Sequence, residues 1–504
     1  MRTAVWAAST RPLSSLEMAV LEANAVALGV TVDQLMENAG RAVAEEAMRR
    51  LPSPPAPLAV VAGTGNKGGD ATCAAFYLHQ WGFSPEIWMV RPPSEIASRA
   101  ARRCFERVER RCPVHVGVPR AEELAEKPLV LDGLLGTGQT GRLRPPVREA
   151  VDAIRASAVP VLSIDLPTGV MDPEGLRPKW TVTLTTAKEE MGPGTSGEVI
   201  VRDIGIPPEA WGRTGPGEYL FLTRGAGAAD ARRTGRVIVV GGGPYSGAPA
   251  LSAMAALRSG AERATVLAPE GSAERIQSFS PNLVVRPFGV GRFRPTDARE
   301  IIEFVRSAGP QAVIVGMGAG AHPETVEALG EIERALVGTV PVVVDADGLA
   351  AVPSADEIRG RGDRAVLVAT PNVGEFARYF DGERTGRMPD DGARAREIAR
   401  ARSLTLLAKG DPDLLSDGDS WFTNAHHHPA MTVGGVGDVL AGVVGSLLAQ
   451  GLRSCHAVRL GAWWVGDAGT RAAARRGRGL VATDVVDELP AALVAALGRL
   501  DAGA

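Results

Sequence analysis

The sequence predicts an α/β protein of two domains, each with a largely parallel sheet covered by helices on both faces. Short apolar runs of strand length alternate with helical segments along most of the 504 residues. The succession of a strand, a glycine-rich loop and a helix occurs near the start of each half, at 58–81 and at 235–269. A chain of this length exceeds one hydrophobic core, so two or three domains are expected.

Composition restricts the class of partner. Lys and Arg number 55 and Asp and Glu number 58, and the resulting net charge of -3 argues against nucleic acid or an anionic membrane as the main partner. The N-terminus lacks the apolar core of a signal peptide and no stretch could span a bilayer, so we expect a cytoplasmic protein with no membrane partner. The cysteines have no paired close spacing and predict neither a zinc site nor a disulfide framework: Cys73, Cys104, Cys112 and Cys455.

The first domain is predicted to span residues 1–224. Apolar residues at helical spacing predict two helices between 14 and 50, with a break near Gly29. Apolar runs then predict strands, which alternate with helices at 71–81 and 94–111: 58–63, 86–90, 113–118, 128–136, 159–170 and 181–186. The segment 192–234 is rich in Gly, Pro and Arg, and we interpret it as domain packing followed by a linker.

The second domain is predicted to span residues 225–504. Its predicted strands lie within or next to the following segments: 235–269, which holds two, the run before 316–320, 341–349, 365–372 and 404–410. Several of these strands end in Gly, Asp or Lys. Because ligands bind at the carboxyl ends of parallel strands, we expect a cleft along this edge of the sheet.

The stretch MTVGGVGDVLAG, residues 431–442, is the strongest local signal. Gly434, Gly435 and Gly437 allow backbone conformations closed to other residues and can turn several N–H groups toward one anion. An apolar run of helical length follows, so the helix would point its positive end at a phosphate. A second negative charge would not aid phosphate binding, so we interpret Asp438 as a base for a substrate hydroxyl. A plain helix start with Asp as a cap is the alternative.

Two loops of the first domain carry polar residues at strand ends. GTGNKGGD (63–70) fits neither the G-x-G-x-x-G fingerprint nor a Walker loop, so it does not predict a generic dinucleotide oxidoreductase. GTGQTGR (136–142) offers side chains that can hydrogen-bond an anionic ligand: Thr137, Gln139, Thr140 and Arg142. Three carboxylates also follow strands, where plain turn caps are the alternative: Asp70, Asp132 and Asp165.

Histidine and lysine raise further candidates. Three adjacent histidines, 426–428, could bind zinc or nickel, but neighbours on an extended segment point in alternate directions and seldom share one ion. Only five of the 55 basic residues are lysines, so a lysine beside a glycine-rich motif or a strand end is a candidate functional residue. Lys67, Lys188 and Lys409 meet this description.

The whole chain resembles the bifunctional NAD(P)H-hydrate repair enzymes. Four blocks resemble the YjeF-type epimerase: QLMENAG (34–40), GTGNKGGD (63–70), LDGLLGTGQTGR (131–142) and SIDLPTG (163–169). Six resemble the dehydratase: YSGAPA (245–250), GMGAG (316–320), DADGL (345–349), TPNVGEF (370–376), AKG (408–410) and MTVGGVGDVLAG (431–442). The resemblance implies an N-terminal Rossmann-like three-layer sandwich and a C-terminal ribokinase-like three-layer α/β domain.

The implied substrates are hydrated NADH and NADPH, written NADHX and NADPHX. The resemblance implies that the first domain interconverts their R and S forms, and that the second dehydrates the S form at the expense of ADP or ATP with Mg²⁺. It also implies a homo-oligomer with no nucleic-acid partner.

The resemblance assigns residues to both sites. In the second domain Asp438 is the base beside Gly437, the nucleotide segment is Lys409, Gly410, Asp411, Pro412 and Asp413, and the hydrate positions are Ala248, Gly318 and Asn372. In the first domain Asp165 is the candidate for proton transfer, and the other hydrate positions are Asn66, Lys67, Gly68, Gly69, Asp70, Gly136, Thr137, Gly138, Gln139, Thr140, Gly141 and Arg142.

Potassium-site positions of the family fall on Lys67, Asp132 and Thr168. Lys67 stands where the family usually has Asn, and an ammonium and a K⁺ ion 4 Å apart would repel each other by about 4 kcal/mol at an effective dielectric constant of about 20. We therefore expect Lys67 to replace the ion and to pair with Asp132. The alternative is that Lys67 turns to solvent and the ion still binds.

Four positions depart from the family pattern: Ala71 replaces Gly, Asn372 replaces His, Val436 replaces Thr or Ser, and His427 replaces part of a run of small residues. They leave the efficiency of each half open.

Two other functions also stay open at this point. One is a small-molecule kinase of the ribokinase superfamily, whose fold is shared, and the other is a YjeF-type domain that binds a nucleotide or a partner without turnover.

Overall fold

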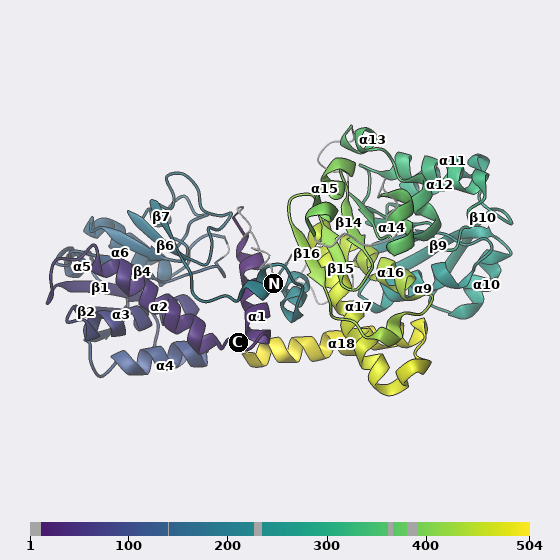
Figure 1. The fold of residues 1–504 in the computed structure, drawn as a ribbon. Coiled ribbons are helices and arrows are strands. Elements are labelled where there is room, and N and C mark those ends of the chain that lie inside the picture. Colours follow the sequence, from purple (N-terminus) through teal and green to yellow (C-terminus); the bar gives the residue numbers. More distant parts are fainter. Residues whose placement is uncertain (1–11, 140, 226–233, 361–365, 381–391, 504) are drawn as a thin grey trace. The chain divides into compact units, whose positions relative to one another are not determined.

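The computed structural model describes residues 12–139, 141–225, 234–360, 366–380 and 392–503. It divides into two compact units: unit 1 ends at Ala210, and unit 2 comprises Trp211–Ala502 (Figure 1). Within the described ranges no helix is both long and apolar enough to cross a membrane.

Among the described residues, unit 1 has a sheet of seven strands that all run parallel in the order β3-β2-β1-β4-β5-β6-β7. The register pairs Ala59 of β1 with Glu86 of β2 and with Val130 of β4. The strands are β1 Pro57–Ala62, β2 Ser84–Met89, β3 Val114–Val116, β4 Val130–Gly133, β5 Val161–Ile164, β6 Trp180–Leu184 and β7 Glu198–Arg202.

Helices cover both faces of this sheet. Leu58, Val60 and Ala62 of β1 join a core with α2, α3 and α4, whereas Ala59 and Val61 join a second core with α5 and α6. This alternation is the period-two pattern of a strand buried on both sides. The predicted three-layer sandwich is therefore confirmed. The helices are α1 Ser15–Ala27, α2 Val32–Met48, α3 Asn66–Gln80, α4 Arg99–Val108, α5 Ala121–Ala125, α6 Val147–Ser157 and α7 Pro208–Trp211, with a 3-10 turn at Pro93–Glu95.

Local signals explain where the first helices start. Ser14 caps α1 and Thr31 caps α2, each in a reciprocal capping box, and Gly29 takes a φ of 101° between them. The predicted break near Gly29 is thus confirmed. Two details differ from the prediction. The loop 63–70 is shorter than expected because α3 already begins at Asn66, and an edge strand, β7, lies in the segment interpreted as packing and linker.

Unit 2 contains nine strands in the order β10-β9-β8-β11-β12-β13-β14-β15-β16. Pairing is parallel from β10 to β14, whereas β15 and β16 form an antiparallel hairpin that the sequence did not predict. The strands are β8 Arg236–Val240, β9 Arg263–Glu270, β10 Val284–Val290, β11 Ala312–Val315, β12 Val342–Val344, β13 Leu367–Ala369, β14 Thr405–Ala408, β15 Asp413–Ser416 and β16 Trp421–Asn424.

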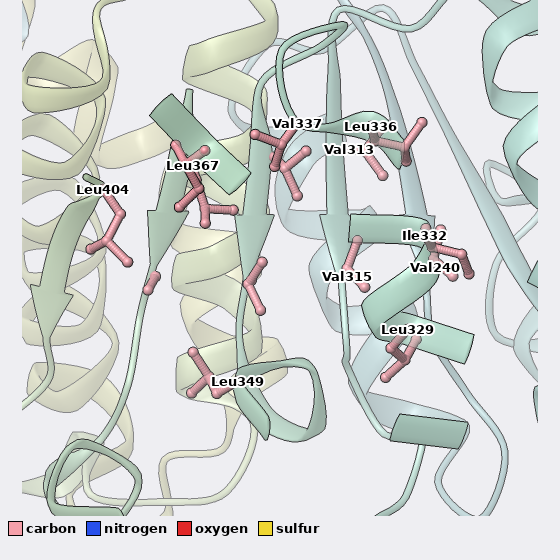
Figure 2. Close-up of a cluster of buried hydrophobic side chains, with 14 of the residues drawn as sticks. Val240, Val313, Val315, Leu329, Ile332, Leu336, Val337, Leu349, Leu367 and Leu404 are labelled. Atoms are coloured by element: carbon pink, nitrogen blue, oxygen red, sulfur yellow. The ribbon is translucent and has the colours of Figure 1, made fainter. Parts of the chain in front are cut away.

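Both faces of this sheet are also covered. Figure 2 shows Leu329, Ile332 and Leu336 of α12 in the same buried cluster as Val313 and Val315 of β11. The helices are α8 Leu220–Arg224, α9 Gly247–Arg258, α10 Ser272–Phe279, α11 Pro295–Ala308, α12 Pro323–Leu336, α13 Ala355–Arg359, α14 Val373–Tyr379, α15 Gly392–Arg402, α16 Val436–Ala449, α17 Ser454–Arg476 and α18 Ala482–Gly503, with 3-10 turns at Pro216–Tyr219, Ala346–Ala351, Pro429–Met431 and Gly477–Gly479.

Helix α16 packs closely on the opposite face of the sheet. A Cβ placed on Gly445 would lie 2.5 Å from Ile314 of β11, and one placed on Gly442 would lie 2.2 Å from the carbonyl oxygen of Ser252 in α9. These two glycines let the helix approach both the sheet and α9. The helix that carries Asp438 is therefore fixed by its packing.

The segment after Ala210 belongs with unit 2. Thr214 N donates to Thr423 O at 2.9 Å and Thr423 N donates to Gly212 O at 2.8 Å, which extends the sheet beyond β16. Farther along, Glu218 forms a buried ion pair with Arg459 at 2.9 Å, and Phe221 stacks on His456 with 3.9 Å between ring centroids. The functional domain boundary at residue 225 stays a prediction, and this packing bears on where a fragment should begin.

Candidate functional site

In unit 1 the predicted residues gather at the carboxyl ends of neighbouring parallel strands. Asn66–Asp70 form the first turns of α3 after β1, Asp132 lies in β4 before the loop 136–142, and Asp165 follows β5. Thr140 lies outside the described residues. Since β1, β4 and β5 are adjacent in the sheet, these segments meet at one edge.

The Lys67 ammonium is enclosed by oxygen atoms of two segments, one at the end of β4 and one after β5. Nζ contacts Asp132 Oδ2 at 3.1 Å, Leu135 O at 2.8 Å, Leu166 O at 2.5 Å and Thr168 Oγ1 at 3.3 Å. The Lys67 side chain is only 4% exposed and that of Asp132 is 0% exposed. Burial lowers the pKa of Lys67, while Asp132 acts in the opposite direction. The pairing expected from the sequence is present.

This arrangement does not fit an additional potassium ion. One carboxylate, two carbonyls and one hydroxyl are the hard oxygen ligands that alkali and alkaline-earth cations prefer. The ammonium of Lys67 already lies among them and contacts Asp132, so it would repel a second cation at the same carboxylate. We therefore derive no step through potassium.

Asp132 also holds the surrounding loops together. Its carboxylate accepts hydrogen bonds from Ser163 Oγ at 2.7 Å, Thr168 N at 3.0 Å, Thr168 Oγ1 at 2.6 Å and Leu134 N at 3.2 Å. Gln139 adds a second bridge, because its Oε1 accepts from Gly169 N at 2.6 Å and its Nε2 donates to Pro167 O at 3.1 Å. Asp132, Thr168 and Gln139 thus shape the site rather than face a ligand.

The glycines predicted to contact the hydrate are needed for packing. A Cβ on Gly68 would lie 1.9 Å from the carbonyl oxygen of Gly63, and a Cβ on Gly69 would lie 2.7 Å from Ala101. Gly136 lies over the stem of Lys67, with 3.4 Å between its would-be Cβ and that of the lysine. A side chain at Gly68 would displace α3 from the loop after β1, and one at Gly69 would displace α3 from α4.

Asp165 is a partly accessible carboxylate at the edge of the sheet in unit 1. Its φ of 62° lies in the left-handed region that non-glycine residues rarely adopt, and such residues often mark functional sites. Oδ1 forms an ion pair with Lys188 and accepts from Leu184 N at 3.4 Å. Among the described residues nothing donates to Oδ2, and the side chain is 14% exposed. This oxygen is available for a proton from a bound molecule.

In unit 2 the predicted residues also lie beyond adjacent parallel strands. Ala248 is in the first turn of α9 after β8, and the other positions follow β11, β13 and β14: Gly318, Asn372 and the segment Lys409–Asp413. Asp438 is in the first turn of α16. The sheet order β8-β11-β12-β13-β14 brings these strand ends side by side.

The start of α16 has the backbone form that the predicted anion loop would need. Gly435 takes a φ of 97° as the N-cap, and a Cβ there would lie 2.7 Å from Leu251 and 2.9 Å from Ala482, so this position requires glycine. A Cβ on Gly437 would lie 3.0 Å from the ammonium nitrogen of Lys409 and would crowd it. The first-turn N–H groups of this 14-residue helix are free of intrahelical partners.

Asp438, Asp345 and Lys409 form a charged cluster at this helix start. Lys409 Nζ contacts Asp345 Oδ1 at 2.7 Å. Burial, reinforced by repulsion from Asp345 and opposed by Lys409, raises the pKa of Asp438 to about 7. Burial likewise raises the pKa of Glu375. A carboxyl with a pKa near neutrality is suited to accept and return a proton at physiological pH.

The segment after β14 is held in a fixed loop. Gly410 N donates to Asp413 Oδ1 at 3.0 Å, Asn424 Nδ2 donates to Asp413 Oδ2 at 2.9 Å, and Lys409 N donates to Pro371 O at 2.7 Å. The Asp413 carboxylate is thus used within the loop. Within this segment Asp411 is largely exposed, and its Oδ1 lies 3.3 Å from His427 Nε2.

Two comparisons with known proteins cover both units. A family profile described as YjeF-related protein N-terminus matches residues 32–190, and one described as NAD(P)H-hydrate dehydratase matches residues 237–491. The bifunctional NAD(P)H-hydrate repair enzyme Nnr of Hyperthermus butylicus is 36% identical over 96% of this chain and 92% of its own length. The enzyme of the same name from Pyrobaculum aerophilum is 36% identical over 95% of this chain and 97% of its own length.

The chain belongs to the family of bifunctional NAD(P)H-hydrate repair enzymes. Among solved structures, an ADP/ATP-dependent NAD(P)H-hydrate dehydratase from Bacillus subtilis, crystallised with ATP and Mg²⁺, is 19% identical with a TM-score of 0.46 and covers 55% of this chain and 98% of its own. The fold class and the enzymatic character predicted from the sequence are confirmed by the family.

The departures from the family pattern have plain structural settings. Ala71 is fully buried in α3, and its methyl lies beside Gly133, where a Cβ would come within 2.4 Å. Asn372 caps α14, since its Oδ1 accepts from Glu375 N at 3.0 Å. Val436 is the first residue of α16, so the backbone N–H groups remain to bind an anion without a hydroxyl at that position.

The three histidines have three separate partners. His426 stacks on Trp463 with 3.9 Å between ring centroids and lies 3.4 Å from Asp467, His427 lies beside Asp411, and His428 accepts from Ala430 N at 3.1 Å. Their side chains diverge, as the alternation of an extended segment predicts.

Sequence reasoning left several site residues without a role. Glu22, Lys188, Asp345, Asp347 and Glu375 all contact or electrostatically influence the predicted groups. Asp345, Asp347 and Glu375 lie in the blocks DADGL and TPNVGEF, and Lys188 is one of the few lysines, so signals existed for these four. Glu22 lies in a helix without a motif.

Proposed function

We propose that this enzyme repairs hydrated nicotinamide cofactors in two steps. Unit 1 interconverts R- and S-NADHX or NADPHX, and unit 2 dehydrates the S form to NADH or NADPH at the expense of ADP or ATP. The carrying observation is that one chain holds two strand-end sites and matches, over almost its full length, relatives named for this repair.

The chemistry of dehydration suits the unit 2 site. The hydrate carries a hydroxyl on the carbon beside the ring nitrogen. Asp438 takes the hydroxyl proton as the oxygen attacks the terminal phosphorus of the nucleotide, and the bond from that phosphorus to the bridging oxygen breaks, which releases AMP from ADP or ADP from ATP. The ring nitrogen's lone pair then expels the phosphate, and loss of a proton from the next carbon restores the ring double bond.

The N–H groups at the start of α16 and the Lys409 ammonium would stabilise charge on the transferred phosphoryl group. Asp347 and Glu375 supply carboxylate oxygens of the kind that Mg²⁺ prefers. Bound Mg²⁺ would neutralise phosphate charge. Lys409–Asp413 would hold the nucleotide, and Ala248, Gly318 and Asn372 the hydrate.

Epimerisation suits the unit 1 site. Inversion at the hydroxyl-bearing carbon requires one of its bonds to oxygen or nitrogen to break and to form again from the other face. A proton must then leave one atom and return to another. Asp165, with one free oxygen, is the proposed base, and the loop 136–142 with Asn66–Asp70 would hold the hydrate.

We also propose that the Lys67 ammonium serves in place of a potassium ion. It is buried, carries the same single charge and contacts four oxygens from two segments, one at the end of β4 and one after β5. The proposal predicts that epimerisation does not depend on potassium. We further expect a cytoplasmic location and a homo-oligomer, and light scattering during size-exclusion chromatography tests the latter.

The competing function is a small-molecule kinase fused to a non-catalytic nucleotide-binding YjeF-type module. A kinase would release a stable phosphorylated product, whereas the repair enzyme returns NADH and frees phosphate. Purified R and S hydrates incubated with ADP or ATP separate the two, because only repair restores the ultraviolet absorbance of the dihydronicotinamide ring. Inorganic phosphate released in equal amount would support the proposed route.

A further inference from the structure

A lysine without an assigned role lies directly behind Asp165. The side chain of Lys188 is fully buried, and its ammonium forms an ion pair with Asp165 Oδ1. The same nitrogen contacts Thr183 Oγ1 at 3.0 Å and the carbonyl oxygen of Leu184 at 2.7 Å. An ammonium has three N–H donors, so none remains for a bound molecule. Lys188 can therefore act only through Asp165.

The backbone around Lys188 is clamped. Leu13 N donates to Ala187 O at 3.0 Å, and Glu189 N donates to Leu13 O at 2.9 Å. Thr183 Oγ1, which accepts from the ammonium, itself donates to Thr186 O at 3.1 Å. These bonds leave the ammonium little freedom to follow a moving carboxylate, so the position of Asp165 Oδ1 is set by the protein.

The two oxygens of Asp165 consequently differ. Oδ1 accepts from Lys188 and from Leu184 N, whereas Oδ2 has no partner among the described residues. The parallel pairing of β5 with β6 places Asp165 and Lys188 at the same sheet edge, although they are separated in sequence. This arrangement fixes one oxygen and leaves the other for a substrate proton.

Other charged groups face the same carboxylate: Glu22 from α1, and Asp70 and Lys67 from α3. Burial and then repulsion from Asp165 raise the pKa of Glu22 to about 7. Burial, Asp165 and Glu22 raise the pKa of Asp70 well above its ordinary range. Of these three carboxyls, Asp165 is the one that forms an ion pair with the buried Lys188 ammonium.

We propose that Lys188 is the positioning residue that holds Asp165, with Oδ1 fixed and Oδ2 free, as the base of epimerisation. The proposal rests on the proposed epimerase function of unit 1. Separate protonation states on adjacent carboxyls are what an acid–base pair needs, because one group must accept a proton while another can donate one.

Lys188→Met in the full chain tests this role. Without the ammonium the Asp165 carboxylate loses its buried ion pair, so the acid limb of the kcat/KM profile for epimerisation should move up by about one to three pH units. At pH values on the acid side of this limb, kcat/KM for epimerisation should fall at least about tenfold, and it should recover at higher pH. Lys188→Arg keeps the charge and should keep the limb. Lys179→Met, at an exposed lysine, is the matched control.

A titration independent of turnover completes the test. Carboxyl NMR of isotope-labelled aspartate, with the Asp165 signal assigned by Asp165→Asn, should show a higher titration midpoint in Lys188→Met than in the wild type. If the wild type does not epimerise, the proposed function fails while the titration still decides the role of Lys188. Lys188→Gln gives the same comparison if the methionine variant does not fold. An unchanged midpoint with a uniform loss of rate at every pH would overturn the proposal.

Discussion

Replacing Lys67 with asparagine should make unit 1 dependent on potassium. The substitution removes the only ammonium that contacts Asp132 within the described part of the chain and leaves a carboxylate that is 0% exposed. The oxygens of Leu135, Leu166 and Thr168 stay in place, and a short amide oxygen joins them. A monovalent cation can then occupy the space that the ammonium filled.

The magnitude follows from the burial of the pair. Removing one partner of a buried ion pair typically costs about 3–5 kcal/mol, because the other charge is left uncompensated. Four hydrogen bonds to Asp132 remain, from Ser163 Oγ, Leu134 N and the N and Oγ1 of Thr168, so we expect the lower end of that range. Potassium at about 100 times its dissociation constant should restore about 2.7 kcal/mol.

Calorimetry of the full chain in potassium chloride and in tetramethylammonium chloride at equal ionic strength measures this. The unit 1 transition of the wild type should not respond to the cation, whereas that of Lys67→Asn should fall without potassium and rise with it. Lys179→Asn, at an exposed lysine, is the control and should behave as wild type. A wild-type transition or epimerase rate that climbs steeply with potassium would refute the replacement.

Three further predictions concern unit 2. Asp438→Asn should lower the dehydration rate by about 100- to 10,000-fold with nucleotide binding retained. The wild-type dehydration rate should rise as pH passes about 7, where Asp438 ionises. Rate measurements and calorimetric nucleotide binding check this, and a variant that keeps half the activity would contradict it. The free energy of unfolding of a fragment starting at residue 225 should be at least about 3 kcal/mol lower than that of a fragment starting at 211, because the shorter fragment loses Glu218, the ion-pair partner of Arg459. Equal stability of the two fragments in urea would count against that packing. Glu333 has two buried oxygens without a hydrogen-bond partner among the described residues, and burial raises its pKa well above the ordinary value. Its protonated form is favoured in the folded state, so its contribution is full below the ordinary carboxyl pKa and is lost as pH rises toward the folded pKa. Glu333→Gln should therefore stabilise the protein by about 1–3 kcal/mol at neutral pH and much less at acidic pH, and a destabilised variant at neutral pH would argue against it.

The sequence predicts those parts of the fold whose signals are local. The apolar strand β1, the break at Gly29 and the glycine-rich start of α16 are examples. Edge strands carry weaker signals, and β7 was missed because two of its five residues are charged and most of its residues face solvent. The hairpin β15–β16 was missed because its strands mix polar with apolar residues, whereas the shorter β12 and β13 are wholly apolar.

Local sequence patterns also predict only part of the candidate sites. Glycine and aspartate at strand ends predict where the candidate sites lie, because parallel strands bring their carboxyl ends to one edge. The partners of those residues are distant in sequence: Lys188 reaches Asp165 through the pairing of β6 with β5, and Lys409 reaches Asp345 across β13. Which lysine meets which carboxylate depends on strand order, and no local pattern encodes it. Lys67 and Asp132 could be paired only because the family resemblance brought them together.

The central claim is that one chain carries both an epimerase and a dehydratase activity. An assay with separated isomers tests this claim most directly. The S hydrate of NADH, given with ADP or ATP and Mg²⁺, should return NADH and inorganic phosphate at once. The R hydrate should do so only as fast as unit 1 converts it, and Asp165→Asn should block the R hydrate while sparing the S hydrate. A stable phosphorylated product, or an R hydrate that is never consumed by the wild type, would contradict the account.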